Sequence, residues 1–210
     1  LELLQFVAPD APIKISRLTV RNLSGRTRHL TVTAYVEWVL GTSSAVTAPS
    51  VSTEVDAATG ALLARNLSSG PDGRVAFVDL RGRQTAWTGD RREFIGRNGT
   101  LERPAALVGR TALSGRTGAG LDPCGALQAP LVLAANSSVE IVWLLGEAAT
   151  TLDAQATIER WRGEDVDASL QGVRRDWNAV LGAVTVQTPD RSFDVMLNGF
   201  GEAAAIEKLR

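Results

Sequence analysis

The chain has 210 residues, a formal net charge of −1 and 44% hydrophobic residues, as expected for a folded globular protein with one large domain or one domain and an appendage. One cysteine and one histidine exclude a disulfide framework and a Cys/His zinc site within the chain. The near-neutral charge gives no reason to expect a nucleic acid or an anionic membrane as partner, and no apolar run is long enough for a transmembrane helix.

Alternating apolar residues predict strands over roughly the first two thirds of the chain. A first run covers 13–20, and the clearest run covers 30–40, where Leu30, Val32, Ala34, Val36, Trp38 and Leu40 share one face. Shorter runs at 61–64, 75–80, 84–87, 131–134 and 139–145 are separated by Gly, Pro and Asn. This pattern predicts a mainly β fold, a large antiparallel β-sandwich in which Leu30, Val32, Val36 and Trp38 point inward.

After Gly146 the apolar spacing changes to that of helices. Thr150 or Thr151 is placed to cap a first helix with a stripe of Ala154, Ile158 and Trp161. A second helix is expected from about Asp165 to Gly182, with Val166, Leu170, Val173, Trp177 and Leu181 on one face. We expect the first four to form a stripe that packs on the sandwich or on a further helical domain, with self-association through this face left open.

Thr188, Pro189 and Asp190 predict the start of a third helix, running through Phe193, Met196, Leu197 and Phe200. The expected organisation is a sandwich over 1–147, a helical linker over 148–187 and the beginning of a further helical domain over 188–210. The chain opens on Leu1 without an initiator methionine, apparently in mid-strand, so we expect it to be a piece of a longer polypeptide.

The segment DRREFIGRNG, residues 90–99, concentrates charge between a strand-like run and the turn signal Asn98-Gly99. Such connections often carry binding groups. The alternative is an ordinary solvated loop in which the arginines pair with Asp90, Glu93 and Glu102.

No residue pattern identifies a catalytic or metal site. The glycine-rich stretch 114–130 matches neither common phosphate-binding motif, and Cys124 has no nearby histidine in the sequence and is expected to be a buried apolar side chain. The Asn-x-Ser/Thr sequons at Asn22, Asn66, Asn98 and Asn136 are better explained by turn chemistry than by glycosylation.

A set of longer strings does carry a resemblance: RTRHLTVTAYVEWVLG, TEVDAATGALLARN, GRVAFVDL, TAWTGDRREFIGRNGTLERPAAL, GRTGAGLDPCGALQAPLVLA and DWNAVLGAVTVQTPDRSFDVMLNGF. In this order they resemble the carbohydrate phosphorylases of glycoside hydrolase family 94, and most of all the phosphorylase-like region of the cyclic β-1,2-glucan synthases. The resemblance implies a β-supersandwich, here truncated at its N-terminus, then a helical linker, then an (α/α) toroid that carries the catalytic aspartate. After MLNG the chain departs from the family pattern.

The resemblance implies that the catalytic and phosphate-binding residues lie beyond Arg210, so we expect no catalysis by this chain. In the parent glycosyltransferase or phosphorylase, inorganic phosphate would be a co-substrate and no cofactor would be needed. The sandwich would support the toroid and contribute loops to the sugar site. We expect Arg92 and Arg97 to contact sugar, and Phe94 with Gly96 to set the loop shape.

The expected partners are a β-glucan or oligosaccharide and the catalytic domain of the same polypeptide, with no nucleic acid and with a homodimer left open. The expected location is cytoplasmic, including the cytoplasmic part of a bacterial inner-membrane protein. Two other functions stay open: an independent carbohydrate-binding module, and a purely structural dimerisation domain.

Overall fold

The computed structural model describes residues 1–70, 73–109, 112–182, 187–194, 196 and 198. The chain divides into two compact units, Leu1–Glu164 and Asp165–Arg210. The first unit therefore includes the helix at 151–163, which the sequence had placed in the linker. Each unit is described by itself.

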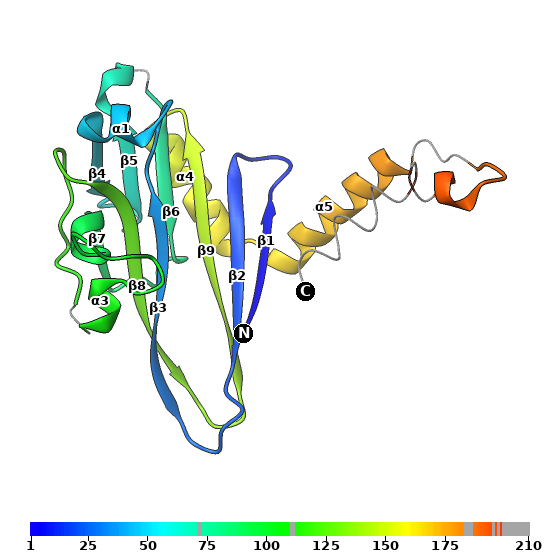
Figure 1. Ribbon diagram of the computed structural model, residues 1–210, viewed down its shortest axis with the longest axis horizontal. Helices are drawn as coiled ribbons and strands as arrows, with labels where there is room; N and C mark the ends of the chain where they lie inside the picture. The colour runs from blue at the N-terminus through cyan, green and yellow to red at the C-terminus, as the bar shows by residue number, and fades with distance from the viewer. Residues whose placement is uncertain (71–72, 110–111, 183–186, 195, 197, 199–210) are drawn as a thin grey trace. The chain divides into compact units, whose positions relative to one another are not determined.

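Nine strands form two antiparallel sheets among the described residues of the first unit (Figure 1). The six-stranded sheet has the order β1-β2-β9-β6-β5-β4, and the three-stranded sheet has the order β3-β8-β7. Their bounds are β1 Glu2–Val7, β2 Ile13–Arg21, β3 Arg28–Glu37, β4 Val51–Val55, β5 Leu62–Asn66, β6 Val75–Asp79, β7 Ala86–Asp90, β8 Pro123–Leu133 and β9 Ser138–Ala148. The predicted mainly β fold with antiparallel sheets is confirmed.

Short helical turns connect several strands. They are α1 Ser44–Thr47, the 3-10 turns η1 Ala48–Ser50 and η2 Leu67–Ser69, α2 Arg91–Phe94 and α3 Ala105–Val108. The longer helices are α4 Thr151–Gly163 and α5 Val166–Leu181. No helix in the described part of the chain is both long enough and apolar enough to cross a bilayer.

The core lies between the two sheets and contains the face predicted from the 30–40 run, with one exception. Ala34 and Trp38 are buried, and Val32 and Val36 pack against the same core. Leu30 was predicted to point inward but is 42% exposed. The first four residues of β3 are all exposed, so this edge strand becomes buried only after Leu30, and Leu30 lies at its uncovered end.

Helix α4 begins where the sequence predicted, since the Thr150 side chain accepts a hydrogen bond from the Asp153 N–H at 3.1 Å. Its predicted stripe of Ala154, Ile158 and Trp161 is fully buried. In Figure 1, α4 lies behind β6 and β9, on the side of this sheet opposite β3. The sequence pattern therefore located both the helix and its buried face.

An ion pair between α4 and β6 is buried at one end. Arg162 donates from Nε and Nη2 to the two carboxylate oxygens of Asp79, at 2.9 and 2.7 Å, and Asp79 is completely buried. The same guanidinium donates to the carbonyl of Thr59 at 2.6 Å, and Gln84 donates to Asp79 Oδ1 at 2.9 Å. This bidentate geometry fixes the helix against the sheet.

The second unit contains α5, which starts at the Asp165 cap and ends at Gly182 as predicted. None of its residues is buried, and Trp177 is 60% exposed, so the α5 stripe is not buried within this chain. Its burial against a further domain or a second copy stays a prediction. Helical turns resume at 191–194, where the N–H groups of Phe193 and Asp194 donate to the carbonyl of Asp190. Leu197, Phe200 and the rest of the third predicted helix lie outside the described residues.

Candidate functional site

The charged segment at 90–99 begins as a single helical turn held by Asp90. The Asp90 carboxylate accepts a hydrogen bond from the Arg92 N–H at 3.0 Å and thereby caps α2. Its other oxygen pairs with Arg116 Nη1 at 3.0 Å, and Asp90 itself is only 4% exposed. The segment is therefore ordered from its first residue, and its buried carboxylate has a partner contributed by a distant loop.

Glu93 is held just as firmly, by three donors. The Ser114 N–H donates to Oε1 at 2.7 Å, while the hydroxyls of Thr88 and Ser114 donate to Oε2 at 2.7 and 2.8 Å. Burial by itself raises the pKa of Glu93, but these hydrogen bonds outweigh it and hold the pKa below the usual 4.5. Glu93 is thus a structural carboxylate that stays ionised.

The low pKa of Glu93 predicts a pH-dependent contribution to stability. Because the pKa is lower in the folded state, the contribution is present above the unfolded pKa near 4.5 and is lost as the pH falls through the folded pKa. We expect Glu93→Gln to lower the free energy of unfolding by about 1–3 kcal/mol at neutral pH, because its amide N–H groups face other donors. The gap to wild type should narrow as the pH falls below 4.5.

Urea unfolding followed by circular dichroism between neutral and acidic pH tests this. Glu159→Gln, at an exposed position of α4, is the matched control and should leave the pH dependence of the free energy of unfolding unchanged. If the free energy of unfolding depends on pH in the same way for wild type and Glu93→Gln, Glu93 is not the stabilising carboxylate assigned above.

The buried side chain of Phe94 anchors the helical turn α2. Its side chain is 2% exposed and its ring stacks on Tyr35 of β3 with 4.8 Å between centroids. Beside it, Glu37 accepts hydrogen bonds from the Tyr35 hydroxyl at 2.8 Å and from Arg91 Nε at 2.9 Å. Burial and the hydrogen bond to Glu37 raise the pKa of Tyr35, so the phenol stays neutral. These contacts fix α2 to the edge strand of the smaller sheet.

Two glycines determine how the chain leaves α2. Gly96 has φ +94°, a conformation that side chains disfavour, and a Cβ there would lie 3.0 Å from the Cβ of Ala105. A Cβ on Gly99 would lie 1.9 Å from the carbonyl oxygen of Ile95. The predicted role of Gly96 in the loop shape has a geometric basis, and Gly99 is a second such position that the sequence reading treated only as a turn signal.

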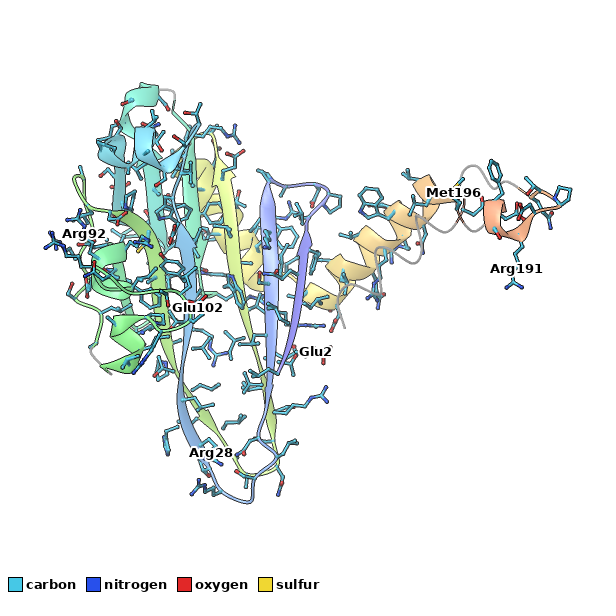
Figure 2. The ribbon with its side chains drawn as sticks, viewed as in Figure 1. Glu2, Arg28, Arg92, Glu102, Arg191 and Met196 are labelled. Atoms are coloured by element: carbon cyan, nitrogen blue, oxygen red, sulfur yellow. The ribbon has the colours of Figure 1, made fainter. Side chains whose placement is uncertain are left out.

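A surface cleft of about 730 Å³ lies beside α2. It is lined by Ala48, Pro49, Asp90, Arg92, Glu93, Arg116, Gly120, Leu121 and Asp122. Figure 2 labels Arg92 at the left edge of the sandwich. Two guanidinium groups and three carboxylates therefore border one opening, without an excess of positive charge.

The predicted sugar contacts do not all meet at this cleft. Arg92 lines it and is exposed, while Phe94 and Gly96 support the turn, and Arg97 is exposed but is not among the lining residues. In the described part of the chain, neither Arg92 nor Arg97 forms an ion pair with Asp90, Glu93 or Glu102. The segment does form surface ion pairs through other residues, Asp90 with Arg116 and Arg91 with Glu37, so an ordinary surface loop stays open as the alternative.

Arg116 is the lining residue that the sequence reading missed. It lies in the glycine-rich stretch 114–130, which was tested only against phosphate-binding motifs. Its distance in sequence from Asp90 leaves no local spacing signal, so only the fold brings the two side chains together.

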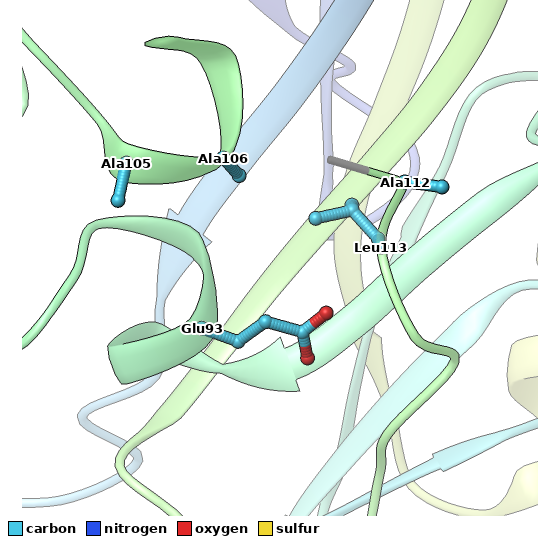
Figure 3. A pocket seen from close by; sticks show the side chains of 5 residues that line it. All are labelled: Glu93, Ala105, Ala106, Ala112 and Leu113. Carbon is cyan, nitrogen blue, oxygen red and sulfur yellow. The ribbon is translucent and has the colours of Figure 1, made fainter. Parts of the chain in front are cut away.

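A smaller pocket of about 150 Å³ lies on the other side of Glu93. Figure 3 shows Glu93 with the remaining lining residues, Ala105, Ala106, Ala112 and Leu113. The carboxylate is already bonded to Thr88 and Ser114, and the other walls are apolar. None of the five described lining residues offers a free polar side chain to a ligand. Likewise, no cluster of potential metal ligands occurs among the described residues.

The family model for the glycosyl hydrolase 94 supersandwich domain matches residues 1–164, the extent of the first compact unit. The chain belongs to this family. The supersandwich chain is also 36% identical over 199 residues to the cyclic beta-(1,2)-glucan synthase NdvB of Rhizobium meliloti (strain 1021). That alignment covers 94% of this chain and 7% of the relative, so the chain spans a small part of that protein's length.

Proposed function

We propose that this supersandwich is a non-catalytic domain of a larger β-glucan synthase or phosphorylase, and that the cleft beside α2 contacts the glucan. The observation that carries the proposal is the convergence of Arg92 and Arg116 on one open cleft whose carboxylates are held in place. Guanidinium N–H groups donate to sugar hydroxyls, and carboxylates accept from them.

The charge of the cleft favours a neutral ligand. Asp90, Glu93 and Asp122 offset the charges of Arg92 and Arg116, so an anion gains little by entering. A neutral saccharide uses donors and acceptors alike. The similarity to a cyclic β-(1,2)-glucan synthase supports a β-1,2-linked glucan as the ligand to test first.

The state of two of the three cleft acids, Asp90 and Glu93, supports a non-catalytic role. A general acid for glycosidic bond cleavage needs a raised pKa, whereas the pKa of Glu93 is lowered. Asp90 accepts from the Arg92 N–H and pairs with Arg116. Both carboxylates are used to hold the structure. The catalytic groups and the phosphate site of the whole protein are then provided by another domain. The proposal also includes a cytoplasmic location for this domain.

We expect Arg92→Ala to weaken binding of β-1,2-glucan oligosaccharides to the chain about tenfold, because one or two hydrogen bonds are lost. Arg116→Lys should have a similar effect, since it keeps the charge near Asp90 but loses the fork of donors. Arg97→Ala tests the other predicted contact and should weaken binding less, since a ligand must extend beyond the cleft to reach it. Calorimetric titration measures each affinity.

The melting temperatures of Arg92→Ala and Arg97→Ala should stay close to wild type, because neither side chain forms a described ion pair. In a longer polypeptide with the catalytic domain, Arg92→Ala should raise the Michaelis constant for glucan. If the chain binds no glucan and this constant does not change, the cleft plays no part in recognition and the domain is purely structural. Release of glucose 1-phosphate by the chain alone would contradict the non-catalytic assignment.

A further inference from the structure

The connections β2–β3 and β8–β9 lie together at one end of the sandwich (Figure 1). Each crosses from one sheet to the other, so neither is a hairpin within a sheet. We call residues 22–28 with 134–137, where the two chain reversals meet, the hairpin tip. The two connections are joined by backbone hydrogen bonds, from Asn22 N–H to the Ser137 carbonyl at 2.8 Å and from Asn136 N–H to the Ser24 carbonyl at 3.3 Å. The hairpin tip is therefore one structural unit made from two separate parts of the sequence.

A buried asparagine fixes the conformation of the hairpin tip. The side chain of Asn22 is 6% exposed, and its Nδ2 donates to the carbonyls of Arg26 and Ala134, both at 2.8 Å. Its Oδ1 accepts from the Ser24 N–H at 3.1 Å and from the Ser24 hydroxyl at 2.7 Å. The bonds of this one side chain order the tip before any partner arrives, and they explain the Asn22 sequon as turn chemistry.

The ordered tip presents apolar side chains to solvent. Leu23 is 89% exposed, and Val132, which lies opposite His29 in the β3–β8 pairing, is 64% exposed. A single exposed leucine is common on soluble proteins and needs no explanation. Here, however, the backbone that carries Leu23 is held by a buried polar side chain, so its outward position is built into the fold.

The charged residues of the hairpin tip are all basic. The hairpin tip contains Arg26 and Arg28 and no acidic residue, and neither arginine forms an ion pair with a described acid. Arg28 donates to the Ser24 hydroxyl at 3.2 Å and is labelled at the lower end of the sandwich in Figure 2. Nearby Arg21 is paired with Glu2 at 3.4 Å. The net charge of −1 for the whole chain thus conceals a local cationic end.

We propose that the hairpin tip docks on an anionic lipid surface, with Leu23 entering the interface and Arg26 and Arg28 facing the headgroups. The tip combines an exposed apolar side chain with two arginines that pair with no described acid, and an anionic bilayer interface binds both kinds of group. Since one apolar side chain or a few charges alone give only marginal binding, both signals are required and the association is reversible.

The test is co-sedimentation of the 210-residue chain with vesicles of phosphatidylcholine alone or mixed with phosphatidylglycerol. We expect binding to the mixed vesicles only, weakened by added salt. Removing the two tip charges in Arg26→Ser/Arg28→Ser should lower the partition coefficient about 25-fold, at roughly fivefold per arginine. Leu23→Ser should lower it about tenfold, and Arg26→Lys/Arg28→Lys should retain binding.

Matched controls are Arg174→Ser/Arg175→Ser on the exposed surface of α5, and Leu152→Ser, whose leucine is 76% exposed on α4. Both should stay within about twofold of wild type, and all variants should keep the wild-type unfolding temperature. The proposal is overturned if the chain binds neither kind of vesicle or binds both equally. It is also overturned if the control substitutions lower the partition coefficient as much as the tip substitutions do. Arginine-dependent capture on heparin without vesicle binding would overturn it too, in favour of a soluble polyanion.

Discussion

Replacing Arg162 by methionine is expected to lower the free energy of unfolding by about 3–5 kcal/mol, because the variant leaves a buried carboxylate without its cation. Asp79 is completely buried, and the bidentate pair at 2.7 and 2.9 Å supplies its charged partner. The donors that remain, Gln84 and the Gly82 N–H, are neutral and cannot replace the guanidinium. Methionine keeps most of the side-chain volume, so the effect reports the charge.

The control is Arg160→Met on the same helix. Arg160 pairs with Asp10, but the two side chains are 50% and 52% exposed, so the expected loss is below about 1 kcal/mol. Urea unfolding monitored by circular dichroism gives both values, provided that the dependence on urea is the same for each protein. Equal losses for the two variants would show that the Asp79 pair has no special importance.

Phe94→Ala is expected to lower the free energy of unfolding by about 3–5 kcal/mol, through lost burial and the cavity left behind. The ring is 2% exposed and stacks on Tyr35 at 4.8 Å, a contact that adds to the burial term. Because Phe94 is the last residue of α2, its loss also frees the turn that carries Arg92. If the proposed glucan contact is correct, glucan affinity should fall along with stability.

Phe193→Ala provides a comparison of the same chemistry at a site that is 47% exposed, where the change should stay within about 0.5 kcal/mol. Thermal and urea unfolding of the two variants measure the difference. A Phe94→Ala protein as stable as wild type would mean that α2 is not anchored through this ring.

Local periodicity was sufficient to predict the buried face of elements whose burial follows the spacing of residues along one strand or one helix. The alternation at 32–38 placed Ala34 and Trp38 in the core, and the stripe of α4 was correct at every position. Both patterns work because side chains repeat every two residues in a strand and about every 3.6 in a helix. The same logic failed for Leu30, which has the right period but lies at the end of an edge strand.

The candidate site could be predicted only in part. The charge and turn signals of residues 90–99 pointed to Arg92, and the resemblance pointed to the family, which the match over 1–164 confirms. Arg116 could not be found in this way, nor could the three donors to Glu93 or the pairing of Arg162 with Asp79. Nothing in local spacing indicates such partners.

The sequence by itself determined the mainly β class, most of the strands, the cap and buried face of α4, and the family, since these depend on residues that are neighbours along the chain or on whole strings. It gave no run for β1 or β4, and only the end of β8. Tertiary structure alone decided which charges become partners and which stay free. A carboxylate buried at Asp79 or Asp90 must find a cation wherever the fold brings one, because leaving it unpaired is costly. At the hairpin tip the reverse holds, since neither Arg26 nor Arg28 pairs with a described acid.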